Sequence, residues 1–292
     1  MTGVVTRFAP SPTGRLHPGH AFSAIQAHDH ARERGGRFLL RIEDIDGTRS
    51  RPEHVAAILA DLEWLGLKWD GEVVFQSERV ALYRAALGRL KEKGLAYPCF
   101  CTRADIAAAG SAPHGPDGPI YPGICRALDE AERAARMAEP HAWRLDMAKA
   151  ARWMQEQGWH AGGLVWLDEL AGSQCADPAA FGDVVLARKD APSSYHLAVT
   201  VDDAAQGVTH VVRGADLFVA THVHRLLQAL LDLPVPVYRH HPLLTDAAGN
   251  RLAKRTGAPT LEGLRLAGMD GRALADELRA GRFPTGFSRA SD

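Results

Sequence analysis

The sequence lacks a marked surplus of charge of either sign and has no long apolar run. Its 292 residues carry 34 Lys or Arg against 35 Asp or Glu, a net charge of -1, so overall charge does not indicate a nucleic-acid partner. The longest apolar stretch, LLQALLDLPVPV, is interrupted by Asp232, Pro234 and Pro236, which argues against a transmembrane helix. The N-terminus has no charged-then-apolar signal pattern. We therefore expect a cytoplasmic protein with no membrane partner.

Cysteine is also scarce, since four residues in a chain of this length are too few for a disulfide scaffold. Three of them cluster, because Cys99 and Cys101 are followed by Cys125 after the Gly/Pro-rich loop GSAPHGPDGPIYPG. A structural zinc would hold such a loop in place, and unliganded buried cysteines are the alternative. Donor chemistry favours His114 over Tyr121 as the fourth ligand, because tyrosine is an uncommon one.

Among the features that are present, the stretch RFAPSPTGRLHPGH, Arg7 to His20, lies between a predicted buried strand and a predicted helix of about four turns. Pro18 suits the first helical position, which places His17 at the cap and His20 one turn in, on roughly the same face. A helix N-terminus favours an anion, and Gly19 lets a flat ring or a phosphate approach the backbone. The turn predicts a phosphate-binding site; a metal half-site and histidines without a role are the alternatives.

Strands and helices alternate after this turn. Residues 37–44 form a buried-strand pattern that ends in acids, residues 50–66 begin with a capping-box pattern from Ser50 to Glu53, and a helix is predicted over about 78–93. Such alternation is typical of an α/β fold with a doubly wound parallel sheet, in which ligands bind at the carboxyl ends of the strands.

The pattern predicts one Rossmann-like nucleotide-binding domain that is interrupted by an insertion. Residues 1–96 and 181–240 are its two halves, and residues 97–180 are an inserted zinc-bearing subdomain, in which GLVWLDELAG suggests strands of its own. Residues 241–292 hold a lysine loop and a short C-terminal helical part.

Four residues suggest the substrate, because Arg7, Glu43, Tyr195 and Arg213 each lie at or near the end of a predicted strand. Two cations, one carboxylate and one phenol match a small zwitterion with an extra acid group, such as glutamate or aspartate. Ordinary surface ion pairs are the alternative.

Two stretches are locally basic. Residues 1–41 hold six Arg against Asp29 and Glu33, a net of +4, and residues 239–255 hold four cations against one acid, a net of +3. They form one polyanion-binding patch if the fold brings them together, and two unrelated solvated faces if it does not.

Near the C-terminus, TDAAGNRLAKRTGA places Arg251, Lys254 and Arg255 on a glycine-flanked loop. Such a loop could close over a triphosphate, with Lys254 stabilising a leaving pyrophosphate.

Together, RFAPSPTGRLHPGH, RIEDID, YHLAVTVDD, THVVRGADL and RLAKR resemble the catalytic core of class I glutamyl-tRNA synthetases, with HPGH at the HIGH position and RLAKR at the KMSKS position. The resemblance covers residues 4 to about 257. Those synthetases continue with a long helical anticodon-binding region, whereas about 35 residues remain here. With its CFC and YPGIC motifs, the chain resembles the truncated paralogous family of glutamyl-Q tRNA(Asp) synthetases, which activate glutamate with ATP and attach it to queuosine in the anticodon of aspartate tRNA.

The resemblance implies a role for each motif residue. Glutamate would be bound by Arg7, Ser11, Glu43, Tyr195 and Arg213. ATP, accompanied by magnesium, would be bound by His17, Gly19, His20, Arg251 and Lys254. Of these, His17, His20 and Lys254 would be catalytic. One structural zinc per chain would be held by Cys99, Cys101, Tyr121 and Cys125, which overrides the preference for His114. Arg251 and Arg255 depart from the loop motif but keep or add positive charge. We expect the protein to be a monomer.

In that reaction the glutamate carboxylate attacks the α-phosphate, so positioning and charge stabilisation matter more than an acid or base. With the short C-terminal region, we expect the acceptor to be the anticodon stem-loop of the queuosine-containing tRNA. The alternatives are a shortened enzyme that charges a tRNA 3′ end with a partner, an HxGH nucleotidyltransferase, and a non-catalytic zinc RNA-binding module. The nucleotidyltransferase would not need the paired Arg7 and Arg213, and the binding module would leave Lys254 without a function.

Overall fold

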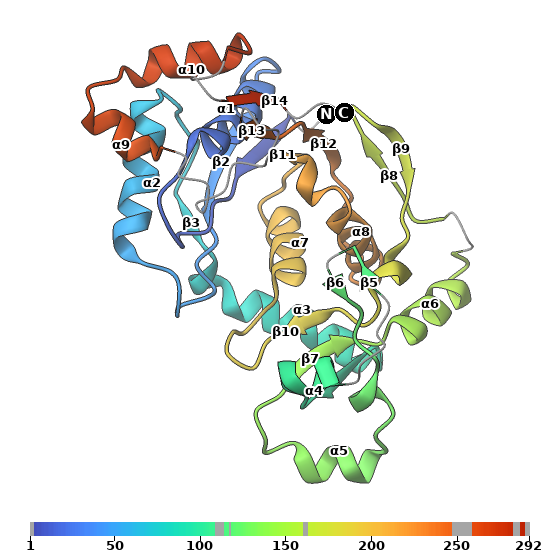
Figure 1. The fold of residues 1–292 in the computed structure, drawn as a ribbon. Coiled ribbons are helices and arrows are strands. Elements are labelled where there is room, and N and C mark those ends of the chain that lie inside the picture. Colours follow the sequence, from blue (N-terminus) through green and yellow to red (C-terminus); the bar gives the residue numbers. More distant parts are fainter. Residues whose placement is uncertain are drawn as a thin grey trace.

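The computed structural model describes residues 3–108, 114–116, 118–159, 163–246, 259–282 and 287–289. Helices surround strands of an α/β core, and the predicted parallel sheet is confirmed (Figure 1). None of the helices in these ranges is long and apolar enough to cross a membrane.

The N-terminal half contains a parallel sheet of order β1-β2-β3, formed by Val5–Phe8, Arg37–Ile42 and Val74–Phe75. Helix α1, Pro18–Arg32, follows β1, and helix α2, Pro52–Trp64, follows β2. The predicted capping box from Ser50 is wrong. The N-cap of α2 is Arg51, because Pro52 occupies the first helical position and the helix starts there.

The second half contains a sheet of order β11-β12-β8-β9, formed by His210–Gly214, Val237–His241, Val165–Asp168 and Gly172–Cys175. The Thr209 amide donates to the Val5 carbonyl over 3.0 Å and joins this sheet to the first. Strand β8 pairs in parallel with β12. The hairpin β8–β9, expected to lie in a separate inserted subdomain, therefore extends the sheet that ends at the pocket described below.

Helix α7, Tyr195–Ala205, precedes β11 in the chain, and helix α8, Ala220–Leu230, follows it. The two helices pack against each other. Tyr195 was expected near a strand end, but it is the first residue of α7. Ser194 caps this helix, since its hydroxyl accepts from the Leu197 amide over 3.4 Å. The apolar and β-branched residues of YHLAVTV obscured this local capping signal in the sequence.

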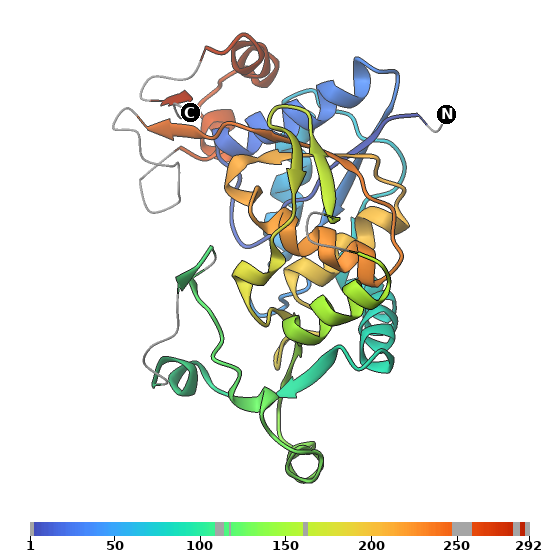
Figure 2. The ribbon, with the colours of Figure 1, turned by 90° about the vertical axis from the view of Figure 1, so that its right-hand side faces the viewer.

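An antiparallel sheet of order β10-β7-β4, from Val185–Ala187, Ala142–Leu145 and Ala96–Cys99, joins the insert to the residues that flank it, since β10 follows residue 180. The remaining elements of the insert are α4 (Arg103–Ala108), β5 (His114–Gly115), β6 (Gly118–Pro119), α5 (Glu130–Arg136) and α6 (Met147–Glu156). Helix α3, Val80–Glu92, precedes it. Figures 1 and 2 show α5 at the opposite end of the molecule from the C-terminal helices α9, Leu261–Leu266, and α10, Gly271–Arg279. Near these helices, β13 (Leu244–Asp246) pairs with β14 (Phe287–Arg289).

A buried ion cluster joins β1 and β2 to α7. Arg41 is fully buried and donates to Asp203 and to Gln206, both over 2.8 Å. Arg7 Nε donates to the same Asp203 oxygen over 3.0 Å. Burial opposes ionisation of Asp203, but the two guanidinium groups hold the pKa of its carboxyl below the ordinary value. The neighbouring Asp202 accepts from Arg79 over 2.6 Å, which brings the start of α3 into the cluster.

This cluster removes two arginines from the expected polyanion-binding patch. Arg7 and Arg41 belong to the basic stretch 1–41, yet both are buried and paired with Asp203. Charge counted along a sequence does not report which side chains reach the surface. The lysine-loop residues Arg251, Lys254 and Arg255 lie outside the described residues.

Replacing Asp203 with Asn should destabilise the protein by about 3–5 kcal/mol, because Arg7 and Arg41 would keep their buried charges without this carboxylate. Urea unfolding measures the change. The control is Asp276→Asn, which removes an exposed partner of Arg279 and should cost within about 0.5 kcal/mol. Equal stability of the two variants would contradict the role given to the cluster.

Candidate active site

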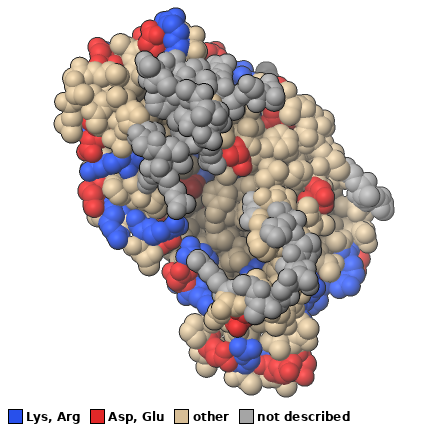
Figure 3. Space-filling model, in the orientation of Figure 1, with Lys and Arg blue, Asp and Glu red and all other residues tan. Residues whose placement is uncertain are grey.

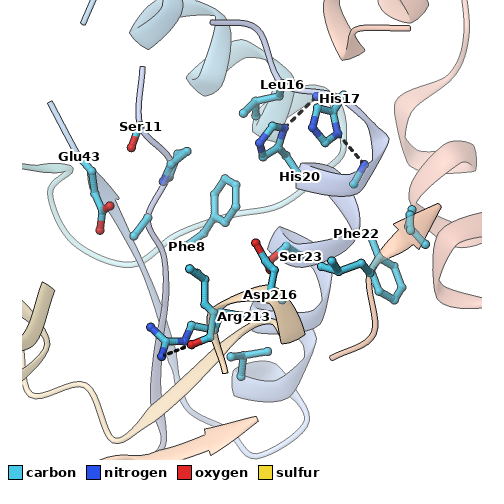
Figure 4. A pocket seen from close by; sticks show the side chains of 18 of the residues that line it. Phe8, Ser11, Leu16, His17, His20, Phe22, Ser23, Glu43, Arg213 and Asp216 are labelled. Atoms are coloured by element: carbon cyan, nitrogen blue, oxygen red, sulfur yellow. Dashed lines mark hydrogen bonds between the residues drawn. The ribbon is translucent and has the colours of Figure 1, made fainter. Parts of the chain in front are cut away.

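A cavity of about 620 Å³ lies where β1, β2 and β11 end and α1 begins. Its lining includes Arg7, Ser11, His17, Gly19, His20, Glu43, Tyr195 and Arg213. Figure 4 shows Ser11 and Glu43 on one side, the two imidazoles on another, and Phe8 between them. Residues from distant parts of the chain, all selected from the sequence, therefore share one cavity.

The two histidines cap the helix that they open. His17 is the N-cap of α1, as predicted, and its Nδ1 accepts from the Gly19 amide over 3.1 Å. His20 Nδ1 accepts from the His17 amide over 3.1 Å, and the ring centroids lie 3.8 Å apart. Because both Nδ1 atoms accept, each neutral ring carries its proton on Nε2. Two imidazole N–H donors at a helix N-terminus suit an anionic phosphate.

Glu43 is held at the other side of the cavity by contacts of its backbone and side chain. Its amide donates to the Pro10 carbonyl over 3.0 Å, which fixes the end of β2 beside the turn after β1. Its carboxylate lies 3.4 Å from Arg41. Burial raises the pKa of Glu43 above its ordinary value despite the positive charges of Arg41 and Arg7. A cationic group in the cavity would favour the ionised carboxylate and so lower this pKa.

Arg213 is fixed by a set of partners that sequence reasoning missed. Its Nε donates to His240 Nε2 over 3.0 Å, and its Nη2 donates to Thr221 over 2.7 Å. Since a guanidinium only donates, His240 Nε2 accepts, and its Nδ1–H donates to Asp168 over 2.7 Å. Burial and then the charge of Arg213 lower the pKa of His240 to about 4, which keeps the ring neutral. Tyr195 accepts from Arg213 Nη1 over 3.3 Å at the cavity wall.

Asp216 also lines the cavity and was not selected from the sequence. A Cβ at Gly214 would lie 2.5 Å from its Oδ1, so glycine permits this close approach. The motif THVVRGADL contains both residues. Its sequence Gly-Ala-Asp directly after a predicted strand could have indicated Asp216 as a site residue.

The cysteine cluster lies in the insert, away from this cavity. The Sγ atoms of Cys99, Cys101 and Cys125 lie within 4.8 Å of one another. The Tyr121 hydroxyl is 3.4 Å from Cys101 Sγ and accepts from the Cys125 amide over 2.8 Å. Three thiols and a phenol at this spacing fit the four-coordinate geometry of zinc. The side chain of His114 lies outside the described residues, so its competition with Tyr121 as a ligand stays open.

A family model described as tRNA synthetases class I (E and Q), catalytic domain, matches residues 3–271. The chain belongs to this family of ligases. Within it, the chain resembles glutamyl-Q tRNA(Asp) synthetases over most of its length. It is 52% identical to the one from Rhodobacter capsulatus, covering 91% of this chain and 96% of the relative. It is 48% identical to the one from Symbiobacterium thermophilum, covering 93% and 84%.

Solved structures agree with this assignment. The glutamate-tRNA synthetase from Elizabethkingia anophelis superposes with a TM-score of 0.72 at 28% identity, over 87% of this chain and 53% of that chain. A glutamate tRNA ligase from Elizabethkingia meningosepticum, solved in complex with its amino acid, gives 0.72 at 27% identity, over 87% and 52%. The chain thus spans about half the length of these solved synthetases.

His17→Ala should lower the free energy of unfolding by about 1 kcal/mol, because the Gly19 amide loses its cap. His17→Asn should retain wild-type stability, since asparagine is a good N-cap residue without an imidazole. Denaturant unfolding of both variants checks the expectation. If the Asn variant were as unstable as the Ala variant, His17 would not stabilise α1 as a cap.

Proposed function

We propose that the protein activates L-glutamate with ATP to glutamyl-adenylate and transfers the glutamyl group to queuosine in the anticodon loop of tRNA(Asp). The carrying observation is that Arg7, Glu43 and Arg213 line the same cavity as the His17–His20 turn. The names of the relatives, glutamyl-Q tRNA(Asp) synthetase, support the acceptor.

Glutamate matches the charges on the amino-acid side of the cavity. Arg7 and Arg213 each offer a guanidinium to a carboxylate, and Glu43 offers a carboxylate to the ammonium. Ser11 and the Tyr195 hydroxyl add neutral polar groups. A neutral amide side chain would leave an arginine without its anion, which disfavours glutamine.

ATP fits the other side. Its phosphates would lie at the N-terminus of α1, near the Nε2–H groups of His17 and His20, with Gly19 allowing close approach. Lys254 and Arg251 are assigned to the nucleotide from their motif alone, since they lie outside the described residues. Magnesium would accompany ATP and reduce the phosphate charge.

The chemistry then needs two displacements. A glutamate carboxylate oxygen bonds to the α-phosphorus as the bond to pyrophosphate breaks. A nucleophilic group of queuosine next bonds to the glutamyl carbonyl carbon, loses its proton, and AMP leaves. Arginines held by Asp203 and His240 supply fixed positive charge, which favours positioning over acid–base catalysis.

Basic side chains near the cavity support an RNA acceptor. Arg15 lines the cavity, and the Arg51 amide donates to the Pro12 carbonyl within the turn after β1. Arg49 and Arg188 both pair with Asp46, beyond the end of β2. Figure 3 shows Lys and Arg side chains beside the central hollow. Cations so placed could hold the phosphates that flank an extruded anticodon base.

For the insert, we propose a structural zinc on Cys99, Cys101, Tyr121 and Cys125. It would stabilise a segment whose small core consists of these residues with few neighbours. We also propose that an inserted segment starting at residue 97 separates the two halves of the catalytic domain. The hairpin β8–β9 belongs to the catalytic sheet, because β8 pairs with β12.

The apparent KM for glutamate should rise as the pH is lowered, because protonated Glu43 cannot pair with the ammonium. The raised pKa of Glu43 places this loss at a higher pH than for an ordinary glutamate. Glu43→Gln should raise KM roughly 10- to 100-fold and flatten its pH dependence. ATP–pyrophosphate exchange measures both, with exposed Glu72→Gln as the control. A wild-type pH profile in the Glu43 variant would remove it from the site.

Purified protein should contain about one zinc at the cysteine cluster, which Cys125→Ser should remove, with proteolysis then increasing between residues 99 and 125. Tyr121→Phe should weaken zinc binding, whereas His114→Ala should not. Metal analysis and limited proteolysis provide the measurements. The reverse ranking would make His114 the fourth ligand.

Incubation with ATP, labelled glutamate and queuosine-containing tRNA(Asp) should place the label on the anticodon stem-loop fragment after RNA cleavage. An isolated stem-loop that carries queuosine should also accept glutamate, and the unmodified stem-loop should not. Label confined to the 3′ terminal adenosine would contradict the proposed acceptor and favour tRNA charging.

A further inference from the structure

Strand β11 joins the cavity to a second group of side chains. It ends near Arg213 in the cavity and begins at His210, beside His30 of α1 and Glu169, which follows β8. One ligand atom from each of these three residues lies within 4.8 Å of the other two. The group contains no cysteine and lies on different elements from the thiol cluster of the insert.

Within this group, His30 is a buried histidine with a ring nitrogen that is unpaired in the described part of the chain. It is only 4% exposed, and its Nε2 has no hydrogen-bond partner within the described residues. The nearest carboxylate oxygen, Glu169 Oε1, is 3.6 Å away, and the same oxygen is 4.0 Å from His210 Nε2. Both separations are too long for hydrogen bonds. A buried, unpaired nitrogen is costly, and beside two other potential metal ligands it points to a bound ion.

The spacing and donor types match a transition-metal site. Around tetrahedral zinc, bonds of about 2.0–2.2 Å hold nitrogen and oxygen ligands roughly 3.3–3.6 Å apart. The separations of 3.6 and 4.0 Å from Glu169 would need to contract by a few tenths of an ångström, and the two imidazole nitrogens, which lie within 4.8 Å of each other, would need to move closer as well. Two imidazoles and one carboxylate are ligands that zinc and neighbouring divalent ions accept.

Outer contacts orient two of the three side chains. The Thr209 hydroxyl lies 2.9 Å from His210 Nδ1, which directs Nε2 of that ring toward Glu169. Arg239 donates to Glu169 Oε2 over 3.1 Å and leaves Oε1 facing the histidines. Such support by neighbouring groups is usual for metal ligands.

We propose that His30, Glu169 and His210 bind one divalent transition-metal ion of the zinc type, with water as the fourth ligand. The side chains of His210 and Glu169 are 20% and 22% exposed, so water and the ion can reach the site. The ion would connect the last turn of α1, the β8–β9 turn and the start of β11. It would thereby fix the N-terminal end of strand β11, whose C-terminal end carries Arg213.

The experiment uses the full chain without a polyhistidine tag. Wild-type protein and the variants His210→Ala, Glu169→Gln and Cys125→Ser are stripped with chelator and titrated with zinc by calorimetry. His54→Ala, which removes a histidine of α2, is the matched control. Melting temperatures of the metal-free proteins check that each variant folds.

Wild type and His54→Ala should bind two zinc ions, one at the cysteine cluster and one at His30, Glu169 and His210. Cys125→Ser should retain only the second ion, whose binding should be weakened roughly 100-fold or more in His210→Ala and Glu169→Gln. Cobalt at this site should give a spectrum without a thiolate charge-transfer band, whereas cobalt at the cysteine cluster should show one. Zinc should raise the melting temperature of Cys125→Ser, and adding His210→Ala should abolish that rise. Unchanged zinc number and affinity in folded His210→Ala and Glu169→Gln would overturn the proposal.

Discussion

The pairing of two buried arginines with Asp203 is the interaction on which the site depends. Arg7 comes from β1 and Arg41 from β2, while Asp203 lies on α7, so one carboxylate fixes three elements. Glu43 follows Arg41 by two residues, and Tyr195 opens the helix that carries Asp203. A buried ion pair tolerates little displacement, because water cannot reach the site to solvate a charge that has lost its partner. The cluster therefore sets the positions of the groups proposed to bind glutamate.

A second series of hydrogen bonds fixes Arg213, the other arginine on this side of the cavity. Asp168 orients His240, and His240 in turn accepts from Arg213. Arginines held in this way lose little freedom when an anion binds, which is the advantage of a preorganised site. The His17–His20 cap does the same on the side proposed for the nucleotide, since each ring is fixed by a backbone amide. Both sides of the cavity thus consist of groups whose orientation is determined before substrate binds.

Local signals predicted the parts of this architecture that local chemistry determines. Pro18 at the first helical position located the turn of α1, and the alternation of apolar runs indicated the parallel sheet. The pairing of Arg41 with Asp203 spans 162 residues and leaves no local pattern, so the sequence did not show that Arg7 and Arg41 of the basic stretch are buried. The attachment of β8 to β12 was missed for the same reason. The resemblance of several motifs to one family identified the residues that line the cavity, but not the partners that hold them.

The central claim is that Arg7, Glu43 and Arg213 bind glutamate beside a nucleotide at the N-terminus of α1. A crystal structure with a non-hydrolysable glutamyl-adenylate analogue tests it most directly. We expect the glutamyl ammonium against Glu43, its carboxylate against Arg7 or Arg213, and the adenylate portion beside His17 and His20. A complex in which the glutamyl group contacts none of these charged side chains, or lies outside this cavity, would contradict it.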